Sequence, residues 1–106
     1  MKVLTSQELR TKIQNKESFI VDMYADWCGP CRVLGPIVER VANKFENDNS
    51  PVGVYKFDIE TDKQLASELN VRSIPTIKAF KNGELVETKI GVIQENQLIE
   101  MANSVL

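Results

Sequence analysis

Two cysteines are the residues of this sequence whose type and spacing could do chemistry. Cys28 and Cys31 are its only cysteines, separated by Gly29 and Pro30 in the pattern C-x-x-C. Two thiols three residues apart in the first turn of a helix lie close enough to form a disulfide. Free N–H groups and the positive end of the helix dipole favour a thiolate there. The spacing predicts thiol–disulfide exchange, with Cys28 as the exposed nucleophile and Cys31 as the shielded resolving thiol.

Two structural uses of the cysteine pair are alternatives to this chemistry. A zinc site needs about four Cys or His ligands, whereas the chain has two Cys and no His. Only two chains that share a metal ion could complete such a site. A purely structural disulfide usually joins distant segments, and it adds little stability when it closes so short a loop.

A strand and a helix must hold the cysteines. Phe19 to Tyr24 is an apolar run typical of a strand that is covered on both faces, and it contains one carboxylate, Asp22. The helix that follows continues through Phe45 with one apolar face. Pro30 suits the first turn of that helix, where a backbone N–H would have no partner within the helix. Asp22 in a buried strand must either be neutral or have a partner.

The remaining elements are predicted from the spacing of apolar residues and from turn signals. Thr5 and Glu8 have the spacing of a capping box, and Asn82-Gly83 is typical of a hairpin turn. The expected segments are a strand at Val3-Leu4, a helix from Thr5 to Asn15, a strand at Val52 to Phe57, a short helix capped by Thr61 or Asp62, strands at Thr76 to Lys81 and Glu84 to Ile90, and a helix at Gln94 to Val105.

This order of elements predicts an α/β fold with one domain over residues 1–106. Right-handed crossovers make the first three strands parallel, and the hairpin adds an antiparallel edge. Helices must then cover both faces of the sheet. We therefore expect a single central mixed sheet of five strands flanked by four helices.

Composition and charge exclude several classes of protein. The chain is 42% hydrophobic and 26% charged with a net charge of −2, and no cluster of basic residues is present. A nucleic-acid partner is therefore not expected. The polar N-terminal segment predicts neither a signal peptide nor a membrane span. A C-x-x-C without a leader indicates a reducing compartment, so we expect a cytoplasmic protein with no membrane partner.

Several short motifs along the whole chain resemble those of one family. They are Val21-Asp22, Ala25, Trp27-Cys28-Gly29-Pro30-Cys31, Pro36, Ile74-Pro75-Thr76, Phe80-Lys81-Asn82-Gly83 and Gly91. Together they resemble the thioredoxin family. Protein disulfide isomerase and glutaredoxin domains share the fold but typically have His or Tyr in place of Gly29 or Pro30. Tyr24, Asp26 and Ser73 stand where thioredoxins often have Trp, Glu and Gly, which affects the expected partner preference and leaves the chemistry intact.

The resemblance implies a function and its partners. It implies a thioredoxin fold and a general protein-disulfide reductase, an electron carrier in cell redox homeostasis that acts on disulfide-containing client proteins as a monomer. No cofactor or metal would be bound. Electrons would come from a thioredoxin reductase of the NADPH/flavin or the ferredoxin type. The alternative is a non-catalytic binding subunit of another protein, in which the cysteines are incidental.

Three further residues receive roles, that of Asp22 with the support of the resemblance. Asp22 would accept a proton from Cys31 and return it through water, although a structural carboxylate bonded to backbone is the alternative. Lys56 is the nearest candidate counter-charge in the neighbouring strand, and a merely solvated lysine is the alternative. Trp27 would shield the cysteines, and a core position is its alternative.

Substrates are expected to bind mainly through the backbone, because a general reductase must accept many unrelated sequences. Extended client segments would pair with main-chain groups at Ile74, beside Ser73 and Pro75. An apolar surface around Trp27, Pro30, Pro75, Gly91 and Val92 would supply unspecific contact. The resemblance also implies a cis bond between Ile74 and Pro75.

Overall fold

The fold is described by a computed structural model, which covers residues 2–106. The elements are β1 (Lys2–Val3), α1 (Ser6–Gln14), β2 (Phe19–Tyr24), α2 (Gly29–Asn47), β3 (Gly53–Asp58), the short 3-10 helix η1 (Ile59–Thr61), α3 (Lys63–Glu68), β4 (Thr76–Lys81), β5 (Glu84–Ile90) and α4 (Glu95–Asn103). The expected strands and helices are all present, with small shifts at their ends, whereas η1 was not predicted. A single domain over residues 1–106 stays a prediction, and Met1 lies outside the described residues.

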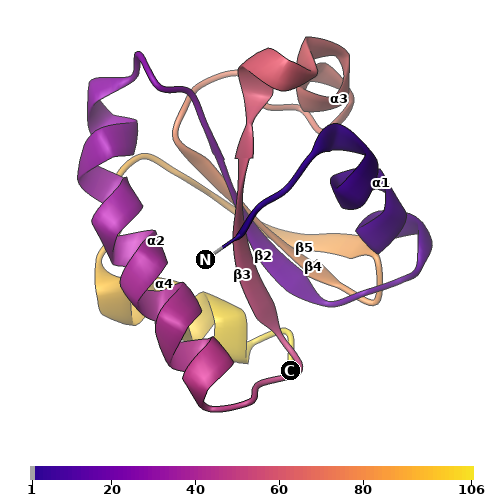
Figure 1. The fold of residues 1–106 in the computed structure, drawn as a ribbon, viewed down its shortest axis with the longest axis vertical. Coiled ribbons are helices and arrows are strands. Elements are labelled where there is room, and N and C mark those ends of the chain that lie inside the picture. The colour runs from indigo at the N-terminus through magenta and orange to yellow at the C-terminus, as the bar shows by residue number, and fades with distance from the viewer. Residues whose placement is uncertain (1) are drawn as a thin grey trace.

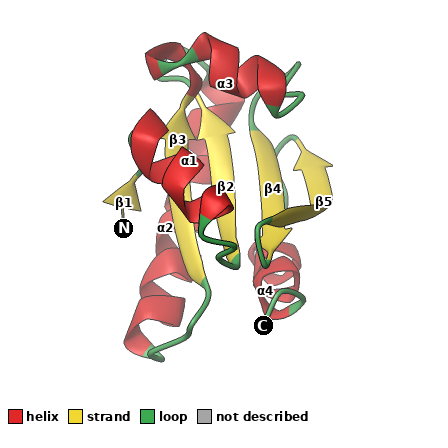
Figure 2. Ribbon diagram, turned by 90° about the vertical axis from the view of Figure 1, so that its right-hand side faces the viewer, coloured by secondary structure: helices red, strands yellow, loops and turns green. Residues whose placement is uncertain are grey.

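The sheet has the order β1-β3-β2-β4-β5, with β2 at its centre (Figure 2). Strands β1 and β2 both pair in parallel with β3, whereas β4 runs antiparallel to both β2 and β5. Helices α2 and α4 lie on one side of the sheet and α1 and α3 on the other (Figure 1). The predicted mixed five-stranded sheet with four flanking helices is confirmed.

Two apolar clusters fill the space between the sheet and its helices. The α2 and α4 side contains Ile20, Leu34, Val38, Ile77 and Leu98, among others. The α1 and α3 side contains Leu9, Phe19, Val21, Phe57 and Leu65, among others. Burial of such side chains supplies most of the free energy that holds a fold of this kind together. Strand β2 contributes to both clusters, as expected for a strand covered on both faces.

Local sequence signals fix several element ends. The Thr5 hydroxyl accepts from the backbone N–H of Glu8, and the Glu8 carboxylate accepts from the backbone N–H of Thr5, so the predicted capping box is confirmed. Asp62 caps α3 through the backbone N–H of Leu65. Asn82 and Gly83 turn the hairpin with φ of 53° and 80°. A Cβ on Gly83 would lie 2.6 Å from the carbonyl oxygen of Ile13, so the turn also needs glycine for space.

One buried charge was not anticipated from the sequence. Lys78, near the middle of β4, is 2% exposed, and its ammonium group donates a hydrogen bond to Thr88 Oγ1 at 3.2 Å. Desolvation lowers the pKa of Lys78 below its ordinary value. Its position in β4 puts it on the same side of the sheet as Phe80 in the α1 and α3 cluster.

Within residues 2–106, no helix has the length and apolar character that a membrane span requires.

Candidate active site

The cysteines lie where the central strand ends and α2 begins. Cys28 is the N-cap residue of α2, and the backbone N–H of Cys31 donates to Cys28 Sγ at 3.2 Å. Pro30 occupies the first turn, as predicted. A sulfur in this position accepts a hydrogen bond from a first-turn backbone N–H that has no acceptor within the helix. The local sequence thus places Cys28 Sγ in an environment that stabilises negative charge.

Cys28 and Cys31 form a disulfide, with their Cα atoms 5.2 Å apart. Cys28 is 5% exposed and Cys31 is 3% exposed. The expectation that Cys28 is exposed is therefore wrong in this disulfide-bonded state, whereas Cys31 is shielded as expected. Its sulfur is covered because Cys28 Sγ faces the carbonyl oxygen of Ile74 at 3.7 Å, so the loop before β4 lies against it.

Asp22 lies in the middle of β2 and is 1% exposed. Neither of its carboxyl oxygens has a hydrogen-bond partner among the described residues. The alternative of a carboxylate bonded to backbone is therefore wrong. Desolvation raises the pKa of Asp22 to about 7, and the positive charge of Lys56 opposes that rise. Asp22 can consequently exist in either protonation state near neutral pH.

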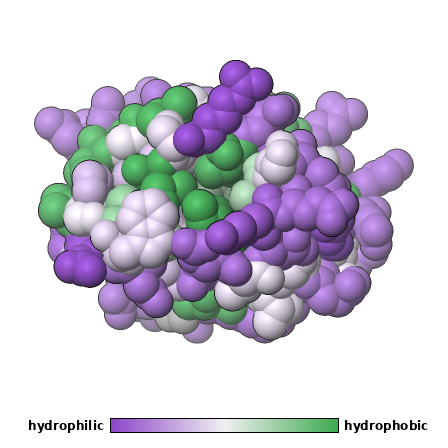
Figure 3. Space-filling model, turned by 90° about the horizontal axis from the view of Figure 1, so that it is seen from above, coloured by the Kyte–Doolittle hydropathy of each residue, from purple (hydrophilic) through white to green (hydrophobic). Residues whose placement is uncertain are grey.

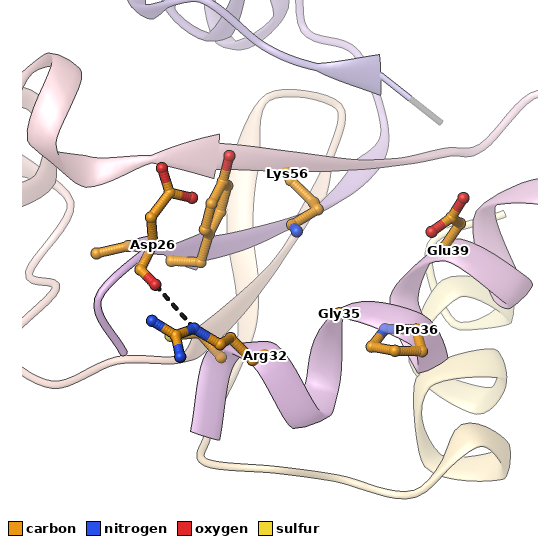
Figure 4. Close-up of a pocket in the computed structure, with 9 residues that line it drawn as sticks. Asp26, Arg32, Gly35, Pro36, Glu39 and Lys56 are labelled. Carbon is orange, nitrogen blue, oxygen red and sulfur yellow. Dashed lines mark hydrogen bonds between the residues drawn. The ribbon is translucent and has the colours of Figure 1, made fainter. Parts of the chain in front are cut away.

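Lys56 is the residue that pairs with Asp22 in the register of β2 and β3. Residues paired across parallel strands share a face of the sheet, and the amino group of Lys56 points toward α2 near Gly35 (Figure 4). A cavity of about 330 Å³ opens here. Its lining includes Tyr24, Asp26, Cys31, Arg32, Glu39 and Lys56. The predicted neighbour relation of Asp22 and Lys56 is confirmed, and the lysine acts on the carboxyl through space rather than through a hydrogen bond.

Trp27 stands on the surface beside the cysteines and is 65% exposed. Its indole N–H donates to Glu60 Oε1 at 2.6 Å, which ties the ring to the segment after β3. That hydrogen bond lowers the pKa of Glu60. The alternative of a core position for Trp27 is therefore wrong. Glu60 was not anticipated, because nothing in the local sequence indicates a contact between residues so far apart in the chain.

Two loops complete the surface around the disulfide. The peptide bond between Ile74 and Pro75 is cis, as the family resemblance implied. The backbone N–H of Gly91 donates to the carbonyl oxygen of Pro75 at 2.9 Å, so the two loops are joined. Gly91 has φ of +91°, a conformation that glycine adopts without strain. Ser73 and Val92 are exposed, and Pro75 is buried.

Apolar side chains gather at this end of the molecule. Figure 3 views it from above, with a group of hydrophobic residues set in a mostly polar surface. The exposed large apolar residues of the chain include Trp27, Val33, Ile90 and Val92. Gly29 also lies at the surface, and a Cβ there would meet no atom within 4 Å. Packing alone therefore does not account for glycine at position 29.

No group of three or more Cys, Asp or Glu side chains in residues 2–106 is arranged to hold a metal ion. The reactive groups of this site are the cysteine pair and the buried carboxyl group of Asp22, whose register partner Lys56 lines the same cavity as Cys31.

Comparison with known proteins agrees with the geometry. The sequence model of the thioredoxin family matches residues 1–104. The chain is 45% identical to the thioredoxin of Rickettsia bellii over 80% of this chain and 78% of the other. It is 38% identical to the thioredoxin of Mycoplasmoides gallisepticum over 95% and 98% of the two chains. A mutant thioredoxin from Halobacterium salinarum is similar in structure, with a TM-score of 0.82, 34% identity and coverage of 99% of this chain and 88% of the other.

These matches and the paired cysteines do not favour a non-catalytic binding subunit. They support dithiol–disulfide redox chemistry and a thiol–disulfide oxidoreductase. The chain belongs to the thioredoxin family.

Proposed function

We propose that the chain is a general reductase of protein disulfides in which Cys28 attacks and Cys31 resolves. The observation that carries this assignment is the hydrogen bond from the Cys31 backbone N–H to Cys28 Sγ. In the reduced protein the same N–H would stabilise a thiolate on Cys28, and the thiolate is the nucleophile in disulfide exchange. Cys31 lies one turn further along α2 and is not at the N-cap, so it lacks this stabilisation of a thiolate.

The reaction takes two exchanges. The Cys28 thiolate attacks one sulfur of a client disulfide, forms a mixed disulfide and releases the first client sulfur as a thiolate. Cys31 then loses its proton and attacks Cys28 Sγ, which releases the second client sulfur. Two electrons have passed to the client, and the disulfide between Cys28 and Cys31 has formed. A thioredoxin reductase, of the NADPH/flavin or the ferredoxin type, returns two electrons to the pair.

Asp22 is the proton acceptor for Cys31 in this scheme, and Lys56 supplies the opposing charge. A carboxyl group with a pKa of about 7 can take up and release a proton at neutral pH, which is what a general base requires. Cys31 lines the cavity beside Lys56, and water there would carry the proton. The same carboxyl group would protonate Cys31 again when the pair is reduced.

Clients bind along the loop before β4. The backbone of Ile74 pairs with an extended client segment, since its carbonyl oxygen already faces Cys28 Sγ. Ser73, Pro75, Gly91, Val92 and Trp27 surround that position, and Gly29 and Pro30 support the cysteine loop. We place the protein in the cytoplasm as a monomer that holds no cofactor.

Trapping of the mixed disulfide tests the order of the two cysteines. Cys31→Ser should accumulate a stable mixed disulfide through Cys28 with a client that carries one accessible disulfide, because the resolving thiol is absent. Cys28→Ser should accumulate far less. Mass spectrometry of the two variants after the same incubation gives the yields, and equal trapping would contradict the order.

A further inference from the structure

Tyr24, the last residue of β2, carries a contact that the proposed mechanism does not use. It stands two residues after Asp22, so both side chains lie on the α2 side of the sheet. The ammonium nitrogen of Lys56 lies over the Tyr24 ring, 4.1 Å from its centroid. A cation at this distance from a ring face is attracted by the ring quadrupole. The ring and Asp22 therefore share one lysine.

The Tyr24 ring, rather than a carboxylate, is the group that contacts the Lys56 ammonium group. Within residues 2–106 no carboxylate forms an ion pair with Lys56. On the α2 side, a Cβ at Gly35 would stand 3.7 Å from Lys56 Nζ, so the absence of a side chain there leaves room for the ammonium group. Figure 4 shows Lys56 projecting from its strand toward Gly35. The ammonium group thus lies between the Tyr24 ring and Gly35, at the edge of the cavity.

We infer that Tyr24 is a positioning residue: its ring holds the Lys56 ammonium group in the cavity, and through Lys56 it sets how readily Asp22 gives up its proton. This inference rests on the proposed function only for its use in the reaction. The contact itself is a property of the folded chain.

The ring matters most while Asp22 is neutral. A protonated Asp22 has no charge to attract Lys56, and an ammonium group is strongly hydrated, so a lysine freed from the ring would turn toward water. Asp22 would then have to ionise without its counter-charge nearby. Loss of the ring should therefore raise the pKa of Asp22, in the same direction as loss of the lysine.

Other charged groups lie near the Tyr24 ring or line the cavity, and all of them are the same in every variant compared. Asp58 follows on β3, and Asp26 lies in the loop after β2. Arg32 and Glu39 line the cavity from α2, as does Cys31, which does not titrate in the disulfide. On the other flank, β4 places apolar Ile77 opposite Asp22. Burial raises the pKa of Tyr24 itself, so the phenol stays neutral while Asp22 titrates.

The test is the pKa of Asp22 in the oxidised protein, followed by the carboxyl carbon resonance in an NMR titration. Lys56→Met should raise that pKa by about 1, the lower end of the effect of a nearby opposite charge. Tyr24→Leu should raise it by a similar amount, and the double variant should go no further than Lys56→Met. Tyr24→Phe keeps the ring and should match the wild type.

A second lysine and tyrosine pair provides the matched control. Lys12 Nζ lies 4.5 Å from the ring centroid of Tyr55 on the opposite side of the sheet, so Tyr55→Leu should leave the pKa of Asp22 unchanged. An unchanged or lowered pKa in Tyr24→Leu would overturn the inference. So would additive shifts in the double variant, or a Tyr24→Phe that behaves like Tyr24→Leu. None of these outcomes would affect the trapping result, so the two proposals fail separately.

Discussion

Replacing Asp22 with alanine should remove a pH dependence from the stability of the protein. In the folded chain desolvation raises the pKa of Asp22 to about 7, against an ordinary value of 3.8. Between these two values the folded state holds the proton more often than the unfolded state does. The free energy of unfolding of the wild type should therefore fall as pH rises through this window and level off above about 7.

The size of the effect follows from the width of the window. It spans about three pH units, and each unit within it is worth about 1.4 kcal/mol, so Asp22 accounts for roughly 4 kcal/mol between its acid and alkaline limits. That is a large share of the free energy of unfolding of a typical domain, which is about 5–15 kcal/mol. The unfilled space in Asp22→Ala adds a cost that does not depend on pH. The variant should therefore gain on the wild type steadily from pH 4 to pH 7 and exceed its stability at pH 8.

Urea unfolding of the two oxidised proteins at a series of pH values measures this directly. The difference in unfolding free energy cancels the contributions of carboxyl groups that the two proteins share, provided that the m-values agree. Val38→Ala is the control, because it removes a buried side chain that does not titrate from the cluster on the α2 and α4 side, which is the side of the sheet that Asp22 faces. Its difference from the wild type should be constant with pH. The reduction rate of Asp22→Ala should fall, since the variant lacks the carboxyl group that we propose as proton acceptor for Cys31.

A flat difference curve for Asp22→Ala would refute the reasoning. It would mean that Asp22 is solvated or paired in solution and has an ordinary pKa. If the stability of Asp22→Ala relative to the wild type instead increased toward acid pH, the direction of the pKa shift would be refuted, since the surroundings of Asp22 would then stabilise the carboxylate.

Two further predictions concern stability away from the disulfide. Lys78→Met should raise the free energy of unfolding at pH 7 by about 1 kcal/mol in thermal or urea unfolding, because it removes a poorly compensated buried ammonium group. This gain should shrink as pH rises toward 10.5, because the lowered pKa of Lys78 makes the side chain neutral in the folded wild type before it is neutral in the unfolded chain. A loss of stability in Lys78→Met would contradict the account. Gly83→Ala should cost at least about 2 kcal/mol, since the residue has φ of +80° and its new Cβ would approach the Ile13 carbonyl oxygen. Gly91→Ala has a similar φ and open space, so equal losses in the two variants would show that space at Gly83 is irrelevant.

Features encoded by neighbouring residues could be predicted from the sequence. The strand from Phe19 to Tyr24 follows from one apolar run, and the start of α2 follows from Cys28 and Pro30. The capping box of Thr5 involves residues three apart and was found with both hydrogen bonds. The pairing of Asp22 with Lys56 could be anticipated because both lie in adjacent parallel strands.

Features that depend on contacts between distant segments could not be predicted. Nothing near Cys28 indicates that the Ile74 carbonyl covers its sulfur, and nothing near Trp27 indicates the bond to Glu60. Lys78 fits the alternation of polar and apolar residues from Thr76 to Ala79 in β4, which is typical of a strand with one solvent-exposed face, yet its side chain is buried. In each case the tertiary packing overrides a local preference.

The position of β2 in the middle of the sheet links the redox site to the cooperativity of unfolding. Its backbone is hydrogen-bonded on both sides, to β3 and to β4, and the α2 N-terminus begins a few residues beyond its end. Amide protons in such a strand exchange with solvent only when most of the structure opens, because no edge allows it to separate first. The cysteine pair is therefore anchored to the part of the chain that unfolds last. Partial opening at β1 or β5 would leave the redox site assembled, and a heated sample should lose activity only as the whole fold is lost.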